Sequence, residues 1–381
     1  MTNQSANITD QLRVLFVVDS HFPVIGGAES QALKLAIALR ERGEHVDFLT
    51  PQLELHDPLV DTHCGFDIKR FSYPHIKYVG TLFMMINFAR CLIASRRDYD
   101  FVHIHITRYL SATAGLIRPF IKLPMMTKIS GFFEFEGGVL DMEGGLQPIN
   151  WLLRKAVRNI DYVHTISHQT RVKLIDAGFD ETQIRFIPNG VSTGEKPSEL
   201  SVHERIVIGY CGRLRHVKGV HVLINAISFL EQNNPEHKIE LRIAGDGATM
   251  DELQLQVSEL GLNDTVVLLG AVSDTTPFYA SLDVYVQPSF AEGLPNSVIE
   301  AMNAGIPVIA SDIGGNQDLV IDDETGYLFT AGDAEQLSRK LDSLLSHSSQ
   351  RRLMGKAGRV RIEEHFDIAR VVDQLVDVYK G

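Results

Sequence analysis

The sequence is poor in cysteine, and Cys64, Cys91 and Cys211 are far apart, with no CxxC or His-paired spacing. This pattern argues against a disulfide framework or a zinc site and fits a reducing cytoplasm. The chain also lacks a basic region before its first apolar run, residues 12–18, so we interpret that run as a strand rather than a signal peptide. No stretch reaches about 18 uninterrupted apolar residues, and we expect no membrane-spanning helix.

The charges are unevenly distributed along the chain. The 381 residues carry 36 Lys and Arg against 48 Asp and Glu, a net charge of −12. Residues 1–190 contain 20 of each kind, so the second half carries the whole acidic excess. Within the first half, residues 69–130 hold ten basic residues and only Asp98 and Asp100 as acids. A basic segment in an acidic protein predicts an anionic partner on one face, and we expect no nucleic-acid partner.

Short apolar, β-branched runs alternate with helical patterns along most of the chain, and a helical pattern over residues 28–42 ends at Gly43. The expected strands include residues 13–18, 46–49, 101–106, 162–166, 206–211, 239–244, 266–269, 284–287 and 308–310. Such alternation predicts parallel sheets covered by helices on both faces.

One polar stretch, Val191–Glu204, interrupts this alternation and predicts a linker. The fold class we predict is α/β, with two doubly wound, Rossmann-like domains facing each other across a ligand cleft. The first domain covers residues 1–190 and the second residues 191–366. We expect a C-terminal helix over about residues 367–381 to pack back on the first domain.

The stretch EGLPNSVIEAMNAGIPVIAS, residues 292–311, combines two glutamates with the start of a helix. After the strand at 284–287, we expect Pro295 in the first turn of a short helix over 297–303 that Gly305 ends. The free N–H groups and the dipole of such a helix start favour a phosphate. Glu292 on the loop and Glu300 within the helix then suit diols on either side, as in a nucleotide sugar. The alternative is that both glutamates are solvated surface charges.

Three further loops follow predicted strands. CGRLRHVKG places Arg213 and Lys218 after the strand at 206–211, and both side chains suit a diphosphate. IAGDG contains Gly245. The third glycine of a dinucleotide fingerprint is absent, so NAD binding is disfavoured. We interpret this loop equally well as a plain tight turn or as a contact to the nucleotide base. VIGGAE contains Gly27, where backbone can approach a phosphate or sugar closely.

Together these stretches resemble the retaining glycosyltransferases of sequence family 4, which have the two-domain GT-B fold. The resemblance covers nearly the whole chain: GGAESQALKLAIALRERGEHV, FIPNGV, GRLRHVKG, IAGDG, LGAV…FYASLDVYVQPS, EGLPNSVIEAMNAGIPVIAS and GG…ETGYLF occur in the family's order. The resemblance implies that a hexose is moved from a nucleotide diphosphate sugar, with UDP or GDP as the expected nucleotide, to a glycan or lipid-linked acceptor. It also implies a place in polysaccharide or glycolipid biosynthesis and no metal or other cofactor.

The same resemblance implies roles for individual residues. Glu292 would contact the donor hexose and support charge at the anomeric carbon, while Arg213 and Lys218 would hold the diphosphate leaving group. Glu300 would hold the ribose diol and Val272 the base. The full set of expected donor-binding residues is Gly27, Gly245, Val272, Gly293, Leu294, Pro295, Asn296 and Glu300.

The sequence departs from the family where many members carry a His-Gly pair in the first domain. The matching stretch is TKISG, with Ser130 in place of the histidine. Either Glu134 or Glu136 compensates, or the leaving phosphate itself takes the acceptor proton and no side-chain base is needed. Ser130, Glu134 and His105 are the expected acceptor-side residues, although we interpret His105, like His103, as structural.

The run Tyr78–Arg97 is strongly apolar, contains Arg90 and ends at Arg96 and Arg97. One interpretation is a buried helix with a positive last turn. The other is a basic and apolar surface, within residues 69–130, that rests on an anionic membrane or grips a lipid diphosphate. We therefore expect a cytoplasmic protein that in the second case is peripheral on the inner face of the membrane. Two other functions stay open: a nucleotide-sugar 2-epimerase on the same fold, and a non-catalytic GT-B subunit.

Overall fold

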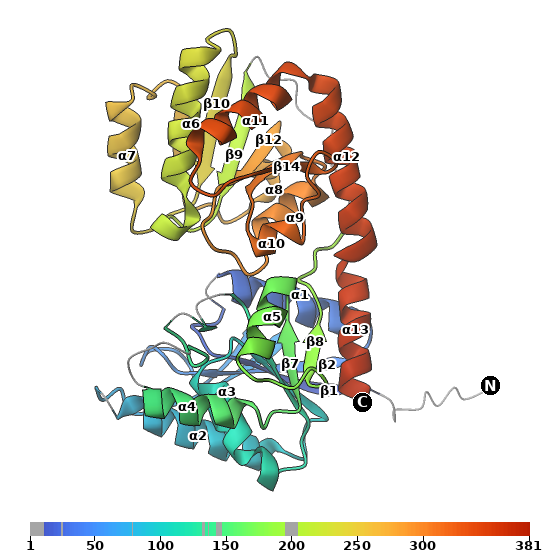
Figure 1. Cartoon of the computed structure of the whole chain (residues 1–381). Helices are drawn as coiled ribbons and strands as arrows, with labels where there is room; N and C mark the ends of the chain where they lie inside the picture. Colours follow the sequence, from blue (N-terminus) through green and yellow to red (C-terminus); the bar gives the residue numbers. More distant parts are fainter. Residues whose placement is uncertain are drawn as a thin grey trace, which may run out of the picture. The chain divides into compact units, whose positions relative to one another are not determined.

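The structure, a computed structural model, divides the chain into two compact units (Figure 1). Unit 1 consists of Met1–Gly190 with Ile368–Gly381, and unit 2 of Val191–Asp367. The residues that the structure describes are 11–23, 26–77, 79–131, 134–135, 137–141, 147–194 and 205–381, without the side chains of 147–150. Most of the predicted linker, and Glu136, therefore lie outside the described residues.

Unit 1 is built on a sheet of eight strands in the order β3-β4-β2-β1-β5-β6-β7-β8. The strands are β1 (Arg13–Val18), β2 (His45–Pro51), β3 (Val60–His63), β4 (Phe66–Phe71), β5 (Phe101–His105), β6 (Met125–Lys128), β7 (Tyr162–Thr165) and β8 (Ile184–Phe186). The helices are α1 (Gly27–Glu41), α2 (Gly80–Ser95), α3 (Tyr109–Ile117), the 3₁₀ turn η1 (Arg118–Phe120), α4 (Gln147–Val157), α5 (His168–Asp176) and α13 (Ile368–Lys380).

The unit 1 strands are parallel except at one edge, where β3 pairs antiparallel with β4. The antiparallel pairing at this edge was not predicted from the sequence. Cys64 and Gly65 join the two strands, and both have positive φ, 50° and 78°. A two-residue turn of that kind matches the twist of a hairpin, so the chain reverses without a helical crossover.

Two apolar cores cover the two faces of the unit 1 sheet. On one face Leu15 and Val17 of β1 belong to a core shared with α2 and α3. On the other face Val14, Phe16 and Val18 pack in a core with α1 and the C-terminal α13. The Tyr379 hydroxyl of α13 also makes a buried hydrogen bond of 2.7 Å with His103 Nδ1 of β5. The end of the chain is thus part of unit 1.

Unit 2 has a parallel sheet of six strands in the order β11-β10-β9-β12-β13-β14. The strands are β9 (Ile206–Cys211), β10 (Ile239–Ala244), β11 (Val266–Gly270), β12 (Val284–Gln287), β13 (Val308–Ser311) and β14 (Gly326–Phe329). The helical elements are the 3₁₀ turn η3 (His216–Lys218), α6 (Val220–Asn233), α7 (Met250–Glu259), α8 (Thr276–Ala280), α9 (Asn296–Asn303), α10 (Gly314–Gln317), α11 (Ala334–Ser346) and α12 (Ser348–His365).

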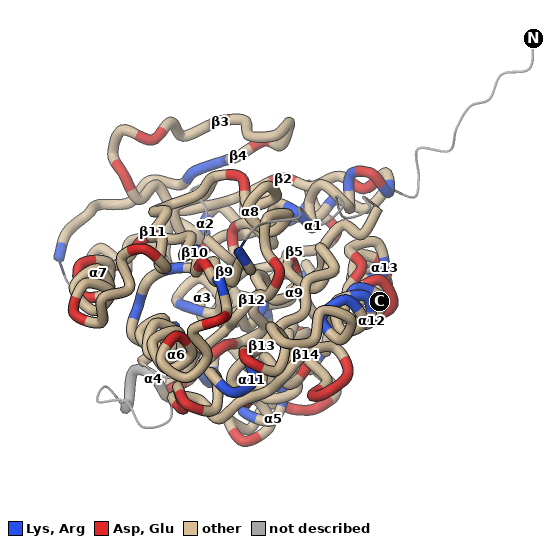
Figure 2. The backbone as a smooth tube through the Cα atoms, turned by 90° about the horizontal axis from the view of Figure 1, so that it is seen from above, with Lys and Arg blue, Asp and Glu red and all other residues tan. Residues whose placement is uncertain are grey.

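The strand order of unit 2 is that of a doubly wound Rossmann sheet, in which the order reverses between β9 and β12. Ligands of such sheets bind beyond the carboxyl ends of the strands at this reversal. In Figure 2 acidic residues stand out on α7, which carries Asp251, Glu252 and Glu259 but no Lys or Arg.

No helix in the described part of the chain combines the length and the apolar character that crossing a bilayer requires. The helix predicted within Tyr78–Arg97 is α2, which buries Gly80, Met84, Phe88 and Leu92. These residues follow one another at intervals of four, so they form one face of the helix against the sheet.

Candidate functional site

The exit loops of β9 and β12 lie against each other where the strand order of unit 2 reverses. The Phe290 N–H donates to the Val217 carbonyl at 2.8 Å. Gly219, between η3 and α6, has φ +66°, and a Cβ there would lie 2.0 Å from the Pro288 carbonyl oxygen. Only glycine permits this approach. The close contact places Lys218, just before Gly219, beside the loop that carries Glu292.

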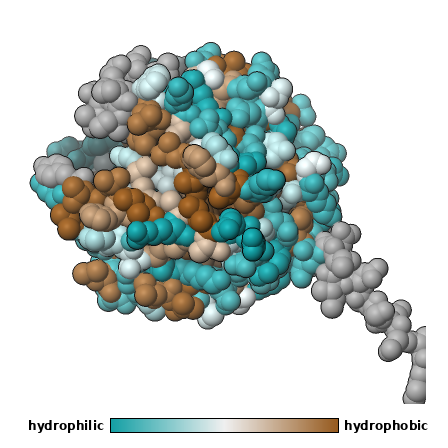
Figure 3. Space-filling view, turned by 90° about the horizontal axis from the view of Figure 1, so that it is seen from below, coloured by the Kyte–Doolittle hydropathy of each residue, from teal (hydrophilic) through white to brown (hydrophobic). Residues whose placement is uncertain are grey.

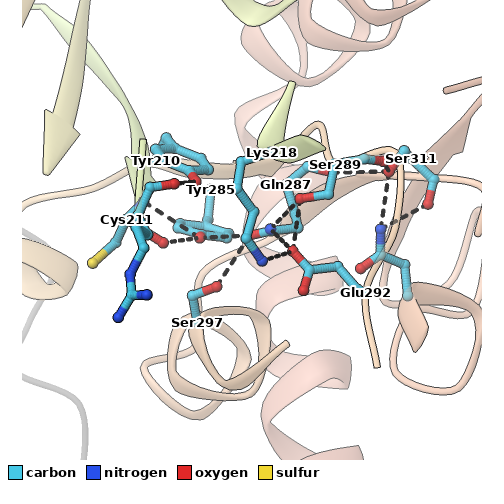
Figure 4. A network of polar contacts seen from close by, with 11 residues as sticks. Tyr210, Cys211, Lys218, Tyr285, Gln287, Ser289, Glu292, Ser297 and Ser311 are labelled. Carbon is cyan, nitrogen blue, oxygen red and sulfur yellow. Dashed lines mark hydrogen bonds and ion pairs between the residues drawn. The ribbon is translucent and has the colours of Figure 1, made fainter. Parts of the chain in front are cut away.

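Glu292 lies at the centre of a polar network in this loop (Figure 4). Its Oε1 accepts hydrogen bonds from Lys218 Nζ at 2.7 Å, from Gln287 Nε2 at 2.8 Å and from Ser289 Oγ at 2.7 Å. The Glu292 side chain is 8% exposed and that of Lys218 is 25% exposed. The carboxylate is thus bonded to one cation and two neutral donors in a mostly buried place. The interpretation of Glu292 as a solvated surface charge is therefore wrong.

A second layer of side chains forms hydrogen bonds with Gln287, which in turn donates a hydrogen bond to Glu292. Gln287 Oε1 accepts from the Tyr285 hydroxyl at 2.8 Å and from Ser297 Oγ of α9 at 3.0 Å. Both Gln287 and Tyr285 are buried. Because both ends of the Gln287 amide are bonded, its orientation and that of the Glu292 carboxylate are determined together.

Glu300, on α9, has a different hydrogen-bond partner. Its Oε2 accepts a hydrogen bond from the Tyr279 hydroxyl of α8 at 3.2 Å. Burial, and after it the charges of Tyr285 and Glu300, raise the pKa of Tyr279 well above its usual value, so the hydroxyl stays a donor. The Tyr279 ring lies 5.8 Å from that of Tyr285. The two glutamates are therefore linked through Tyr279, Tyr285 and Gln287.

The residues between the two glutamates form the start of α9. Gly293, Leu294 and Pro295 are buried, and Asn296 is the first residue of the helix. Pro295 is the N-cap residue, with φ −73° and ψ 115°, so its prediction inside the first turn was wrong by one position. Its carbonyl accepts from the Val298 N–H at 3.2 Å. Gly305 has φ +75° after the helix, as predicted for its terminator.

The remaining predicted donor residues of unit 2 occupy neighbouring strand exits. Arg213 follows β9 and is exposed, and its carbonyl lies 3.4 Å from the Tyr210 hydroxyl. The Gly245 N–H, after β10, donates to the Gly270 carbonyl at 2.7 Å, and a Cβ on Gly245 would lie 1.9 Å from the Gly212 carbonyl oxygen. Val272 is half-buried just after β11. All of them lie at the carboxyl edge of the sheet, as Lys218 and Glu292 do.

The predicted residues of unit 1 lie at or beyond the carboxyl ends of its strands or at the start of α1. Gly27 is the exposed first residue of α1. Glu134 is fully buried, and its carboxylate accepts from the Ser130 N–H at 2.8 Å and from the Gly131 N–H at 3.1 Å. Burial raises the pKa of Glu134 to about 7 although these N–H groups lower it. The carboxylate thus holds the backbone at the position where the family has its histidine.

The two histidines of β5 are both buried, on the same face of the sheet as Phe16. His103 contacts Tyr379 and, at 3.3 Å, His164 Nδ1. Neither ring nitrogen of His105 has a hydrogen-bond partner among the described residues. Burial lowers the pKa of both rings well below the usual value, so both are neutral.

Two family models match the chain, one on each half. The model described as "Glycosyltransferase Family 4" matches residues 25–195, and the model "Glycosyl transferases group 1" matches residues 192–361. Both matches cover the strand exits described above. The chain belongs to the family 4-type glycosyltransferases of the GT-B fold.

Curated relatives of this glycosyltransferase include two bacterial proteins. The N-acetyl-alpha-D-glucosaminyl L-malate synthase of Bacillus anthracis is 24% identical over 94% of each chain. The capsular polysaccharide biosynthesis glycosyltransferase CapM of Staphylococcus aureus is 31% identical, over 47% of each chain. The match to CapM therefore spans about half the length of that relative.

Solved structures support the GT-B fold of the glycosyltransferase. Sucrose-phosphate synthase from Thermosynechococcus elongatus aligns with a TM-score of 0.82 at 23% identity, over 97% of this chain and 98% of that one. Anabaena HepE in complex with UDP and glucose aligns with a TM-score of 0.79 at 22% identity, over 97% and 100%.

Several residues that form hydrogen bonds with the site glutamates of this glycosyltransferase were not predicted from the sequence. Gln287 and Ser289 are polar residues at the end of a buried strand, the same signal that pointed to Glu292, and could have been found by it. Tyr279 carries no comparable signal. Its hydroxyl contacts Glu300 only because α8 and α9 lie beside each other in the fold.

Proposed function

We propose that this glycosyltransferase moves a hexose from a nucleotide diphosphate sugar to a glycan or lipid-linked acceptor with retention of configuration. The observation that carries the proposal is the pairing of Lys218 with Glu292 where the strand order of unit 2 reverses. Lys218 would bind the leaving diphosphate and Glu292 the sugar. The two side chains lie side by side, as cleavage of the bond between sugar and diphosphate requires.

The neighbouring groups suit the other parts of such a donor. The positive end of the α9 dipole suits a phosphate, and Arg213 adds a second cation. Glu300, oriented by Tyr279, suits the ribose diol. We propose that these cations and the helix start neutralise the diphosphate without a metal. The leaving phosphate would take the acceptor proton, since Glu134 is occupied with the backbone of Ser130 and Gly131.

The names of similar proteins support the choice of donor and pathway. Anabaena HepE was solved with UDP-glucose, and Staphylococcus aureus TarM with UDP. CapM is named for capsular polysaccharide biosynthesis and LpsE of Rhizobium meliloti for the lipopolysaccharide core. By analogy we propose a UDP-sugar donor and a role in cell-surface polysaccharide biosynthesis.

A thermal-shift screen with nucleotide sugars tests the proposed donor. UDP or a UDP-sugar at 100 times its dissociation constant should stabilise the fold by about 2.7 kcal/mol. GDP-sugars are the matched comparison. A rise in melting temperature with neither nucleotide class would contradict the proposed function. Conversion of the donor sugar to its epimer without an acceptor would favour the epimerase instead.

We also propose that α2 and its neighbours rest on an anionic membrane. The outer face of α2 exposes Leu82, Phe83, Ile86 and Ile93, opposite its buried face. Phe120 of η1 is 84% exposed, and Trp151 and Leu152 of α4 are exposed as well. Figure 3 shows hydrophobic side chains gathered on this end of unit 1. An apolar face with cations beside it is typical of a surface that lies on a bilayer.

Only part of the charge of residues 69–130 is available for this contact. Arg70 and Lys128 are buried, and Arg118 makes two hydrogen bonds of 2.6 Å to Asp161. These three cations are therefore engaged within unit 1. Arg90, Arg96 and Arg97, on and just after α2, are exposed.

Replacing Arg90, Arg96 and Arg97 by Gln should weaken binding to acidic vesicles and leave UDP binding unchanged. Each such cation is worth about 1 kcal/mol near an anionic surface, and salt screens it. Sedimentation with neutral and acidic vesicles at two salt concentrations measures the effect. Arg339, Arg352 and Lys356 of unit 2, changed to Gln, form a control with the same loss of charge. Equal pelleting of the parent and the α2 variant would contradict membrane contact.

A further inference from the structure

A cavity of about 170 Å³ lies in unit 2 between the start of α6 and the first turns of α7. The two helices lie side by side in Figure 1. None of the residues assigned to the donor sugar, the diphosphate or the nucleotide lines this cavity. A single water needs only about 10–15 Å³ of such space, so the cavity has room for a ring-sized ligand. The donor site therefore leaves it unexplained.

Thr249 places a buried hydroxyl without a partner in the wall of this cavity. It is the N-cap residue of α7 and is 5% exposed, yet its side chain makes no cap hydrogen bond. Its hydroxyl has no other hydrogen-bond partner among the described residues either. A threonine at this position usually accepts from the N–H groups of its helix, and buried hydroxyls are almost always bonded. The hydroxyl therefore calls for a partner from outside the chain.

The other polar groups of the wall include both donors and acceptors. The guanidinium of the exposed Arg215 has no hydrogen-bond or ion-pair partner in the described part of the chain. Gln256 donates through Nε2 to two acceptors on α6, at 2.8 and 2.9 Å, so its Oε1 is left as an acceptor. Glu252 adds a carboxylate, 3.2 Å from His216 Nε2. Hydroxyl groups suit such a wall, because each of them can donate and accept at once.

The rest of the wall is apolar or aromatic. Val220 and Leu253 are buried at the cavity. The His221 ring is stacked on that of Phe290, with centroids 5.9 Å apart and an angle of 20° between the planes. A sugar ring matches this combination, because it has C–H groups on its faces and hydroxyls at its edge.

The charges at the cavity favour a neutral ligand. Arg215 is a cation and Glu252 a carboxylate, so a phosphate would be repelled by Glu252 and an ammonium ion by Arg215. Burial, and after it the neighbouring His216, lower the pKa of His221 although Glu252 raises it, so this ring adds no charge near pH 7.

We propose that the cavity between α6 and α7 binds a neutral sugar unit of a glycan through Arg215, Thr249 and Gln256. This sugar is not the one that is transferred, because the cavity lies outside the network around Glu292. Phe290 belongs to the loop that carries Glu292, so a glycan held against His221 lies beside the donor site of the same unit. The site thus goes beyond the proposed transfer reaction and adds a second contact to carbohydrate.

Saturation-transfer NMR on the full chain, with UDP present, tests the cavity. The probes are the methyl pyranosides of glucose, mannose, galactose and N-acetylglucosamine, and at least one of them should give a signal with the parent. Arg215→Gln should weaken that binding by about tenfold or more, because a charged donor is lost. Thr249→Val keeps the shape of the side chain without its hydroxyl and should weaken binding by about 2- to 10-fold.

A matched control makes the loss specific to the cavity. Arg352→Gln changes an exposed arginine of α12, also in unit 2, and should bind the sugar as the parent does. Because Arg215 is exposed, its replacement tests the site even if Thr249→Val does not fold. Three outcomes would overturn the inference: no signal with the parent, parental affinity in Arg215→Gln, or displacement of the sugar by inorganic phosphate. UDP binding by the same samples reports separately on the proposed function.

Discussion

Glu292→Ala should lower the rate of sugar transfer about 100- to 1,000-fold and leave the affinity for UDP intact. The carboxylate lies in a nearly buried network of Lys218, Gln287 and Ser289, so it is already oriented before the donor arrives. A preoriented charge stabilises developing positive charge at the anomeric carbon far better than water does. Initial transfer rates and UDP titrations of the same preparation measure the two effects.

Two controls make the Glu292 experiment specific. Glu292→Gln keeps the hydrogen bonds but removes the charge, and should be nearly as slow as Glu292→Ala. Glu236→Ala removes an exposed carboxylate before β10, at the opposite edge of the sheet, and should transfer normally. Glu300→Ala should instead weaken UDP binding, because its proposed partner is the ribose. Transfer at the parental rate by Glu292→Ala would show that this carboxylate does not lie beside the hexose.

Lys218→Ala should weaken UDP binding by about 10- to 150-fold, because a charge-assisted hydrogen bond is worth about 1.5–3 kcal/mol. The same change removes the cation from Glu292 and should lower the free energy of unfolding. The loss should be smaller than the about 3–5 kcal/mol of a fully buried pair, since Lys218 is 25% exposed. Calorimetry with UDP and thermal melts separate the two effects. Arg213→Ala should weaken UDP binding without lowering the free energy of unfolding.

The double variant Lys218→Ala/Glu292→Ala distinguishes phosphate binding from simple destabilisation. Removing both charges should restore much of the stability, because no uncompensated carboxylate is left, but it should not restore UDP affinity. Lys238→Ala, an exposed lysine just before β10, is the matched single control. If the Lys218 variants bind UDP as tightly as the parent, the assignment of Lys218 to the leaving group is wrong.

Features that depend on neighbouring residues in the chain were predicted well from the sequence. The strands at 206–211, 239–244 and 284–287 have the predicted bounds, and Gly305 ends α9 as expected. Apolar runs, turn glycines and helix starts act over a few residues, so a short window of sequence contains their cause. For the same reason the sequence alone places Lys218, Arg213 and Glu292 just after strand exits and Glu300 in the short helix that follows.

Features that depend on distant parts of the chain were decided only by the tertiary structure. Lys218 and Glu292 are 74 residues apart in the sequence and meet because β9 and β12 are neighbours in the sheet. The β3–β4 hairpin, the burial of Arg70 and Lys128, and the cavity between α6 and α7 were likewise not predicted. Burial and pairing follow from strand order and from which face of the sheet a helix covers. The sequence by itself determined which groups could bind a nucleotide sugar, and the fold decided which of them lie together.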